Sequence, residues 1–114
     1  MRIVMKFGGT SVGGEQALKN VVALTGRYAK SNDVVVVASA MNGVTNTLMD
    51  ASNWASQRDQ AHVAEILEQL RRRHESTCRQ VIASTDLMRK TTARLDDELK
   101  ELERALTGIS YLAE

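Results

Sequence analysis

Hydrophobic and polar positions change period several times along this chain of 114 residues, and each change marks a predicted element. An apolar run at residues 2–7 predicts a short first strand. Residues 15–30 carry apolar side chains at helical spacing, which predicts an amphipathic helix. The next run, at residues 34–38, begins with four consecutive valines. Such a run predicts a strand buried on both faces, as in a parallel sheet that helices cover.

Strand, helix and strand in this order form a βαβ unit, which predicts an α/β fold class with a right-handed crossover. The loops after the two strands are residues 6–10 and 39–45. Ligands of parallel sheets collect outside the carboxyl ends of the strands. We therefore expect these two loops to be neighbours in space and to face one crevice.

The remaining sequence predicts helices only. A helix over residues 44–55 has an inner face of Val44, Leu48, Ala51 and Ala55, with Trp54 covering an edge of the core. From residue 57 the apolar positions recur in alternating steps of four and three, interrupted by capping residues at 83–86. This pattern predicts two long antiparallel helices, a helical hairpin whose firmest seam is Leu99, Leu102 and Leu106. We accordingly divide the sequence into a βαβα segment, 1–56, and a hairpin segment, 57–114.

Composition and charge narrow the range of functions. A formal net charge of +1 argues against nucleic acid and against an acidic membrane surface as partners. No apolar run approaches the roughly 20 residues of a transmembrane helix. The single cysteine cannot form an internal disulfide, so we expect a cytoplasmic protein.

Three features of the hairpin segment invite a functional reading, but each has a simpler structural one. Arg71-Arg72-Arg73 is surrounded by glutamates at helical spacing, which favours an ion-paired surface. His62 and His74 lack nearby cysteine or carboxylate ligands, so we predict no metal site. Cys78 lies at the edge of the helical seam and is expected to be a small packed residue.

The candidate chemistry lies in the two loops. In Lys6-Phe7-Gly8-Gly9-Thr10-Ser11-Val12, paired glycines let backbone N–H groups approach a phosphate, and the following helix adds its dipole. A tight turn with an exposed lysine explains this stretch alone equally well. In the second loop, the hydroxyls of Ser39 and Thr45 could hold a carboxylate, although Ser39 could simply end a strand and Thr45 could cap a helix.

Taken together, residues 6–12 and the segment Val35-Val36-Val37-Ala38-Ser39-Ala40-Met41-Asn42-Gly43-Val44-Thr45-Asn46 closely resemble the N-terminal signatures of aspartokinases, members of the amino-acid kinase superfamily. The resemblance extends over essentially the whole chain. It implies an amino-acid-kinase-type parallel sheet, with the helical hairpin as an insertion in the same catalytic domain. It also implies ATP-dependent phosphorylation of the side-chain carboxylate of L-aspartate to 4-phospho-L-aspartate, which begins lysine, threonine and methionine biosynthesis.

The same resemblance implies roles for individual residues. Lys6 would contact the transferring phosphoryl group as the catalytic lysine, and Lys6, Phe7, Gly8 and Gly9 would bind ATP. Thr10, Ser39, Ala40 and Thr45 would contact aspartate. ATP would enter with Mg²⁺ as a substrate, and no tightly bound cofactor is expected.

Family members are much longer, and the segments that carry their second half-site and their regulatory domains are not matched here. We therefore expect a fragment with an incomplete catalytic domain, inactive alone. Two alternatives remain. The piece could act as a helical interaction or assembly module, since two strands leave an open edge that invites pairing and a homo-oligomer. Another amino-acid kinase of the same fold fits the second loop less well.

Overall fold

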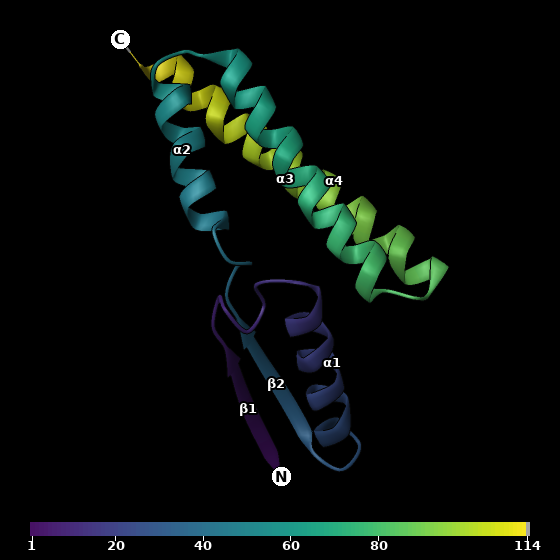
Figure 1. The fold of residues 1–114 in the computed structure, drawn as a ribbon. Helices are drawn as coiled ribbons and strands as arrows, with labels where there is room; N and C mark the ends of the chain where they lie inside the picture. The colour runs from purple at the N-terminus through teal and green to yellow at the C-terminus, as the bar shows by residue number, and fades with distance from the viewer. Residues whose placement is uncertain (114) are drawn as a thin grey trace. The chain divides into compact units, whose positions relative to one another are not determined.

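The computed structural model describes residues 1–113, and its elements follow the order β1, α1, β2, α2, α3 and α4 (Figure 1). Their bounds are Arg2–Phe7, Glu15–Ala29, Asp33–Ala38, Val44–Ser56, Gln60–Val81 and Thr85–Leu112. The chain separates into two compact units, Met1–Val44 and a second unit that begins at Thr45. The predicted division at residue 56, into a βαβα segment and a hairpin segment, was drawn from sequence patterns and stays a prediction.

In the first unit, β1 and β2 pair in parallel, as the valine run and the βαβ order predicted. The register places Arg2 opposite Asp33 and Phe7 opposite Ala38. The Arg2 Nε atom donates to an Asp33 carboxylate oxygen at 2.9 Å, at the end of the sheet where both strands begin. The α/β class is therefore confirmed, with a two-stranded parallel sheet.

Helix α1 packs against one face of this sheet. Ile3, Met5 and Phe7 are half-buried, and the Thr25 hydroxyl of α1 lies 3.9 Å from the Met5 sulfur. The alternate side chains of β1, among them Val4 and Lys6, are exposed and occupy the opposite face. This alternation is the ordinary consequence of a strand with one covered face.

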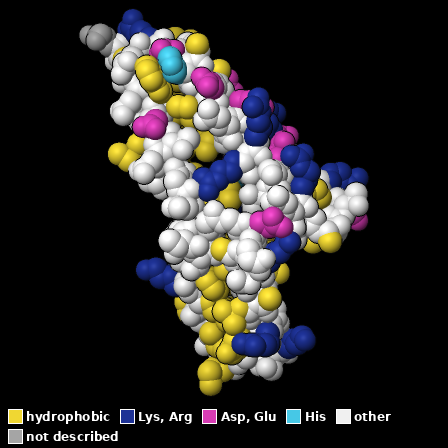
Figure 2. Space-filling model, in the orientation of Figure 1, with side chains coloured by type: hydrophobic (Ala, Val, Ile, Leu, Met, Phe, Trp, Pro, Cys, Tyr) yellow, Lys and Arg dark blue, Asp and Glu magenta, His cyan; other side chains and the backbone are white. Residues whose placement is uncertain are grey.

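The prediction that the valine strand is buried on both faces is wrong. Val35, Val36 and Val37 are 43–47% exposed, and Val4 of β1 is 65% exposed. The register pairs Val4 with Val35 and Lys6 with Val37, so these four side chains share the sheet face away from α1. We call Val4, Val35 and Val37 the open valine face. Figure 2 shows the hydrophobic side chains gathered over the strands.

The second unit contains the predicted helical hairpin, made by α3 and α4. The chain leaves α3 at Val81 and enters α4 at Thr85, and the Ser84 hydroxyl caps α4 by accepting the Leu87 N–H at 3.3 Å. The predicted break at residues 83–86 is therefore confirmed in position, although Thr85 and Asp86 already belong to α4. Ser84 satisfies one of the unpaired amides that every helix start exposes.

The core of the second unit joins α2 to both hairpin helices. Ala51 and Ala55 of α2 are fully buried against Val63 of α3 and Leu106 of α4. Small alanines let the α2 backbone approach the hairpin closely, which explains why this cluster forms. Leu48 was predicted on the same face but is 37% exposed, so that assignment is wrong.

Trp54 and His62 organise the corner between α2 and α3. Their rings stack with centroids 3.9 Å apart and planes 8° apart. Asp59 caps α3 with one carboxylate oxygen, which accepts the His62 N–H at 3.1 Å, and its other oxygen lies 2.7 Å from His62 Nδ1. These hydrogen bonds, the backbone one first, lower the pKa of the Asp59 carboxyl.

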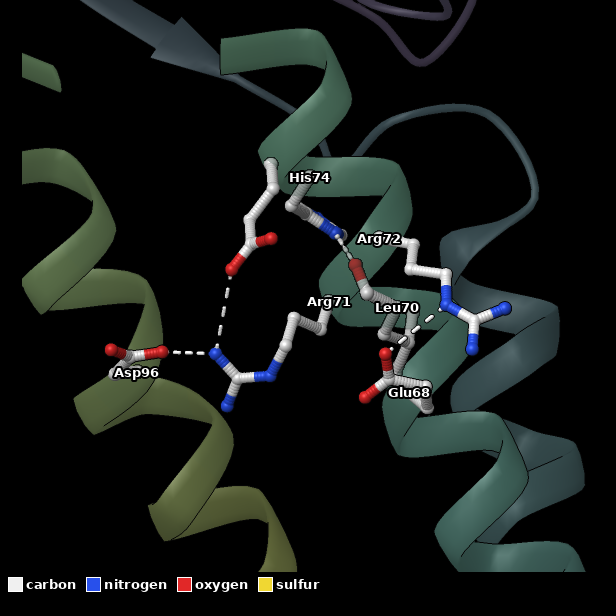
Figure 3. Close-up of polar contacts among 7 residues, drawn as sticks. Glu68, Leu70, Arg71, Arg72, His74 and Asp96 are labelled. Atoms are coloured by element: carbon white, nitrogen blue, oxygen red, sulfur yellow. Dashed lines mark hydrogen bonds and ion pairs between the residues drawn. The ribbon is translucent and has the colours of Figure 1, made fainter. Parts of the chain in front are cut away.

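Polar contacts along the hairpin confirm the predicted ion-paired surface at Arg71 and Arg72 (Figure 3). Arg71 reaches across to Asp96 of α4 and lies 3.6 Å from Glu75, while Arg72 pairs with Glu68 at 3.1 Å. The hydrogen bond to Asp96 raises the pKa of Arg71.

Two other polar groups of the hairpin, on α3, are partly buried. The Nδ1–H of His74 donates to the Leu70 carbonyl at 2.7 Å, so this histidine is hydrogen-bonded to its own helix. Cys78 is half-buried, and burial raises the pKa of its thiol.

Among residues 1–113 no group of three histidine, cysteine or carboxylate side chains is placed to hold a metal ion. No helix in that range combines the length and apolarity needed to cross a membrane.

Candidate functional site

The glycine-rich loop between β1 and α1 consists of two successive turns. The Ser11 N–H donates to the Gly8 carbonyl at 3.0 Å, and the Gly13 N–H donates to the Thr10 carbonyl at 3.3 Å. Val12, only 3% exposed, anchors the loop. The loop is therefore closed by its own backbone hydrogen bonds and held by one buried side chain.

The second loop follows β2 and lies directly against the first. The Ser39 N–H donates to the Phe7 carbonyl at 3.1 Å, which continues the parallel ladder past the end of β2. A methyl group placed on Gly9 would lie 3.7 Å from the Ala40 carbonyl oxygen. The expectation that the loops after β1 and β2 are neighbours is thus confirmed for the part within the first unit.

Several backbone amides at this junction lack a backbone acceptor among residues 1–113. The N–H groups of Gly9 and Thr10 make no backbone hydrogen bond to any described residue. Helix α1 starts after Gly14 without a side-chain cap, so its first-turn amides also lack that partner. The acidic residue of that turn, Glu15, is paired with Lys19 at 2.7 Å. Unpaired amides at a glycine turn and at a helix start are the donors that phosphate-binding loops use.

Lys6 supplies the full positive charge beside this loop. Its side chain is exposed on the sheet face away from α1 and makes no ion pair with residues 1–113. The Ser39 hydroxyl, also exposed, has no hydrogen-bond partner in the same range, so it does not serve as a satisfied strand end. Both groups are available to a ligand.

The other predicted site residues differ in their exposure and in the element on which they lie. Gly8 and Thr10 are exposed in the first loop, and Ala40 in the second. Phe7 is half-buried and lines a hollow together with Ser11 of the first loop and with residues of α1, namely Ala17, Val21 and Leu24. Thr45 is exposed inside the first turn of α2, so it is not the residue that precedes that helix. Because Thr45 begins the second unit, its role beside Lys6 stays a prediction.

Two residues at the junction, Gly13 and Gly14, were not predicted from the sequence. A methyl group on Gly13 would lie 3.3 Å from the Asn42 Cβ, so Gly13 is a second point where the loops meet. Gly14 begins α1 in an extended conformation. The signal for both was a second glycine pair immediately before the helical pattern.

Comparison with known proteins gives concordant results. Residues 1–107 match the model of the family described as "Amino acid kinase family". The chain is 33% identical over 110 residues to "Bifunctional aspartokinase/homoserine dehydrogenase 1, chloroplastic" of Zea mays, an alignment that covers 96% of this chain and 12% of that protein.

Bacterial relatives match a shorter part of the chain at higher identity. An "Aspartokinase" of Rickettsia prowazekii is 47% identical over 55 residues, covering 47% of this chain and 12% of the relative. "Aspartate kinase Ask_LysC" of Stutzerimonas stutzeri is 42% identical over 57 residues, covering 49% of this chain and 14% of the relative. The alignments thus span 12–14% of the length of these relatives.

Proposed function

Because this chain belongs to the amino acid kinase family, we propose that it forms the phosphate-binding part of an aspartate kinase. The reaction is ATP-dependent phosphorylation of the side-chain carboxylate of L-aspartate to 4-phospho-L-aspartate. This product is the activated acid that starts lysine, threonine and methionine biosynthesis. The observation that carries the proposal is the junction itself, where unpaired amides and an unpaired lysine lie beside two touching loops.

The chain's groups act by positioning and by charge. In phosphoryl transfer the negative charge is spread over equatorial oxygens, and the protein mainly orients and stabilises them. The amides of Gly9 and Thr10 and the α1 start hold the ATP phosphates, with Gly8 in the same turn and Lys6 beside the transferring group. A lysine about 4 Å from a unit negative charge contributes on the order of 4 kcal/mol at an effective dielectric near 20, and exposure to solvent lowers this figure.

The second loop binds L-aspartate, the acceptor of the phosphoryl group. The backbone of Ala40 and the hydroxyl of Ser39 hold the aspartate carboxylate, with Thr10 contributing a further hydroxyl. None of these groups adds charge, so the nucleophilic carboxylate keeps its own negative charge for attack on the phosphorus. A hydroxyl can hold a carboxylate by one donated hydrogen bond.

Magnesium enters with ATP as part of the substrate. Residues 6–14 and 39–43 contain no carboxylate, and carboxylates are the protein ligands that Mg²⁺ prefers. The two loops therefore do not fit a protein-held magnesium site, and no step is assigned to one.

The experiment compares two lysines of equal charge at opposite ends of the sheet. Binding of Mg-ATP to the 114-residue chain is measured by titration calorimetry or NMR at low ionic strength, for Lys6→Ala and Lys30→Ala. Lys30 follows α1, next to the start of β2, and is exposed. We expect Lys6→Ala to weaken binding about tenfold, equivalent to about 1.4 kcal/mol, and Lys30→Ala to change it less than twofold.

Equal affinities for the two variants would refute the role of Lys6, and no binding by the unmodified chain would refute the phosphate-binding junction. A second measurement tests completeness. Since the alignments span 12–14% of the relatives, we propose that this chain alone does not phosphorylate aspartate. Hydroxylamine trapping of aspartyl phosphate from the purified chain with Mg-ATP and aspartate would contradict this.

A further inference from the structure

Gly13 occupies the most crowded glycine position of the first loop. A methyl group on its Cα would lie 3.2 Å from the Gly9 carbonyl oxygen, 3.3 Å from the Thr10 carbonyl oxygen and 3.3 Å from the Asn42 Cβ. All three distances are tighter than most Cβ contacts in proteins, so a methyl group would fit only if these neighbours moved by a few tenths of an ångström. At Gly8 and Gly14 the same methyl group would meet nothing within 4 Å.

The requirement for glycine at this position comes from space and not from backbone conformation. Among the described glycines the left-handed region is occupied by Gly43, with φ of 84°, and not by Gly13. A side chain at Gly13 therefore requires its neighbours to shift, whatever its backbone conformation. Two of these neighbours are backbone oxygens of the first loop, which cannot rotate away as a flexible side chain can.

The third neighbour belongs to the second loop. Gly13 also donates its N–H to the Thr10 carbonyl, so its own position is fixed by the turn that presents the Gly9 and Thr10 amides. A residue with a Cβ at position 13 has two ways to fit. It displaces Asn42 and with it the second loop, or it opens the turn.

We propose that Gly13 is a positioning residue that sets the spacing between the phosphate-binding turn and the loop of Ser39–Gly43. The inference rests on the proposed function, because the spacing matters where a phosphoryl donor and a carboxylate acceptor must meet in line. Gly13 touches neither substrate. It acts through the backbone of the first loop and through Asn42 of the second.

The test compares two adjacent glycine-to-alanine substitutions. Gly13→Ala and Gly14→Ala change the chain's composition identically, but only the first meets close neighbours. Amide chemical shifts of the ligand-free chain report the loop positions directly. We expect Gly13→Ala to shift the amide signals of residues 39–43 and to weaken the NOE between positions 13 and 42, and Gly14→Ala to leave both as in the unmodified chain.

A rescue variant separates spacing from general loss of structure. Asn42→Gly removes the Cβ that faces position 13, so the double variant Gly13→Ala/Asn42→Gly should return the signals of residues 39–41 towards those of Asn42→Gly alone. Mg-ATP affinity is measured on the same samples. We expect Gly13→Ala to weaken binding at least threefold and the double variant to recover part of that loss.

The outcomes distinguish the two claims. If Gly13→Ala moves residues 39–43 no more than Gly14→Ala does, or if Asn42→Gly rescues nothing, the positioning role is overturned. If the unmodified chain binds no Mg-ATP while the shifts and the rescue behave as expected, the proposed function fails and the spacing role of Gly13 stands. If Gly13→Ala does not fold while the double variant does, the clash with Asn42 is supported.

Discussion

Truncating Leu106 tests whether the small cluster between α2 and the hairpin holds the second unit together. Leu106 is 3% exposed and packs with Ala51, Ala55 and Val63. Leu106→Ala removes the equivalent of three methylene groups, worth about 0.8 kcal/mol each in transfer from water. The remaining cavity adds to this loss, which gives a destabilisation of about 3 kcal/mol, inside the range of 2–5 kcal/mol for buried leucines.

Urea unfolding followed by tryptophan fluorescence is a suitable assay, because Trp54 is the only tryptophan and packs against the same cluster. The signal therefore reports the second unit. With a urea dependence of about 1.5 kcal/mol/M, a loss of about 3 kcal/mol lowers the midpoint by about 2 M. Leu112→Ala is the matched control, since Leu112 lies on the same helix but is 84% exposed. We expect it to change stability by less than about 0.5 kcal/mol.

Equal midpoint shifts in the two variants would show that burial of Leu106 does not decide the stability of this unit. A changed slope in Leu106→Ala would point instead to altered compactness of the unfolded or folded state, or to unfolding that is not two-state. Either result would contradict the assignment of Leu106 to a core that unfolds as one.

Two further predictions concern charged groups of the second unit. Hydrogen bonds from His62 lower the pKa of the Asp59 carboxyl in the folded state. The ionised carboxylate therefore stabilises the fold fully above its pKa in the unfolded chain, about 3.9, and this stabilisation is lost as pH falls through its lower pKa in the folded chain. Asp59→Ala should therefore destabilise the chain at pH 7 by a margin that shrinks below about pH 4, and a margin independent of pH in urea titrations would contradict this. For the pair Arg71–Asp96, a double-mutant cycle with alanine should give a coupling of about 0.2–1 kcal/mol that falls as salt is added, and coupling unaffected by 1 M NaCl would refute a simple surface ion pair.

Local signals in the sequence predicted the elements well. The first strand was expected at residues 2–7 and the hairpin break at 83–86, and both are observed. These features depend on neighbouring residues only, such as the Ser84 cap and the apolar runs, so no knowledge of the tertiary structure was needed. The adjacency of the two loops also followed, because parallel pairing alone brings the ends of β1 and β2 together.

What failed depends on contacts that are distant in sequence. The valine run matched the pattern of a covered strand, but covering also requires elements to lie on both faces, and α1 lies on one. Leu48 has helical spacing with Ala51 and Ala55, yet how far a helix face extends into a core depends on where its partner helices end. Gly13 was not predicted, because one of the neighbours that crowd it is Asn42, about thirty residues away.

The open valine face also has a consequence for how the chain behaves in concentrated solution. Val34 to Ala38 is a short, uncharged, proline-free segment of high β-propensity, the kind of sequence that adds to like strands and starts fibrillar aggregation. Asp33, held by Arg2, is the charged residue at its start and so acts as a gatekeeper against such growth. The same strand that brings the second loop beside the first therefore also gives the uncovered sheet a segment that favours aggregation.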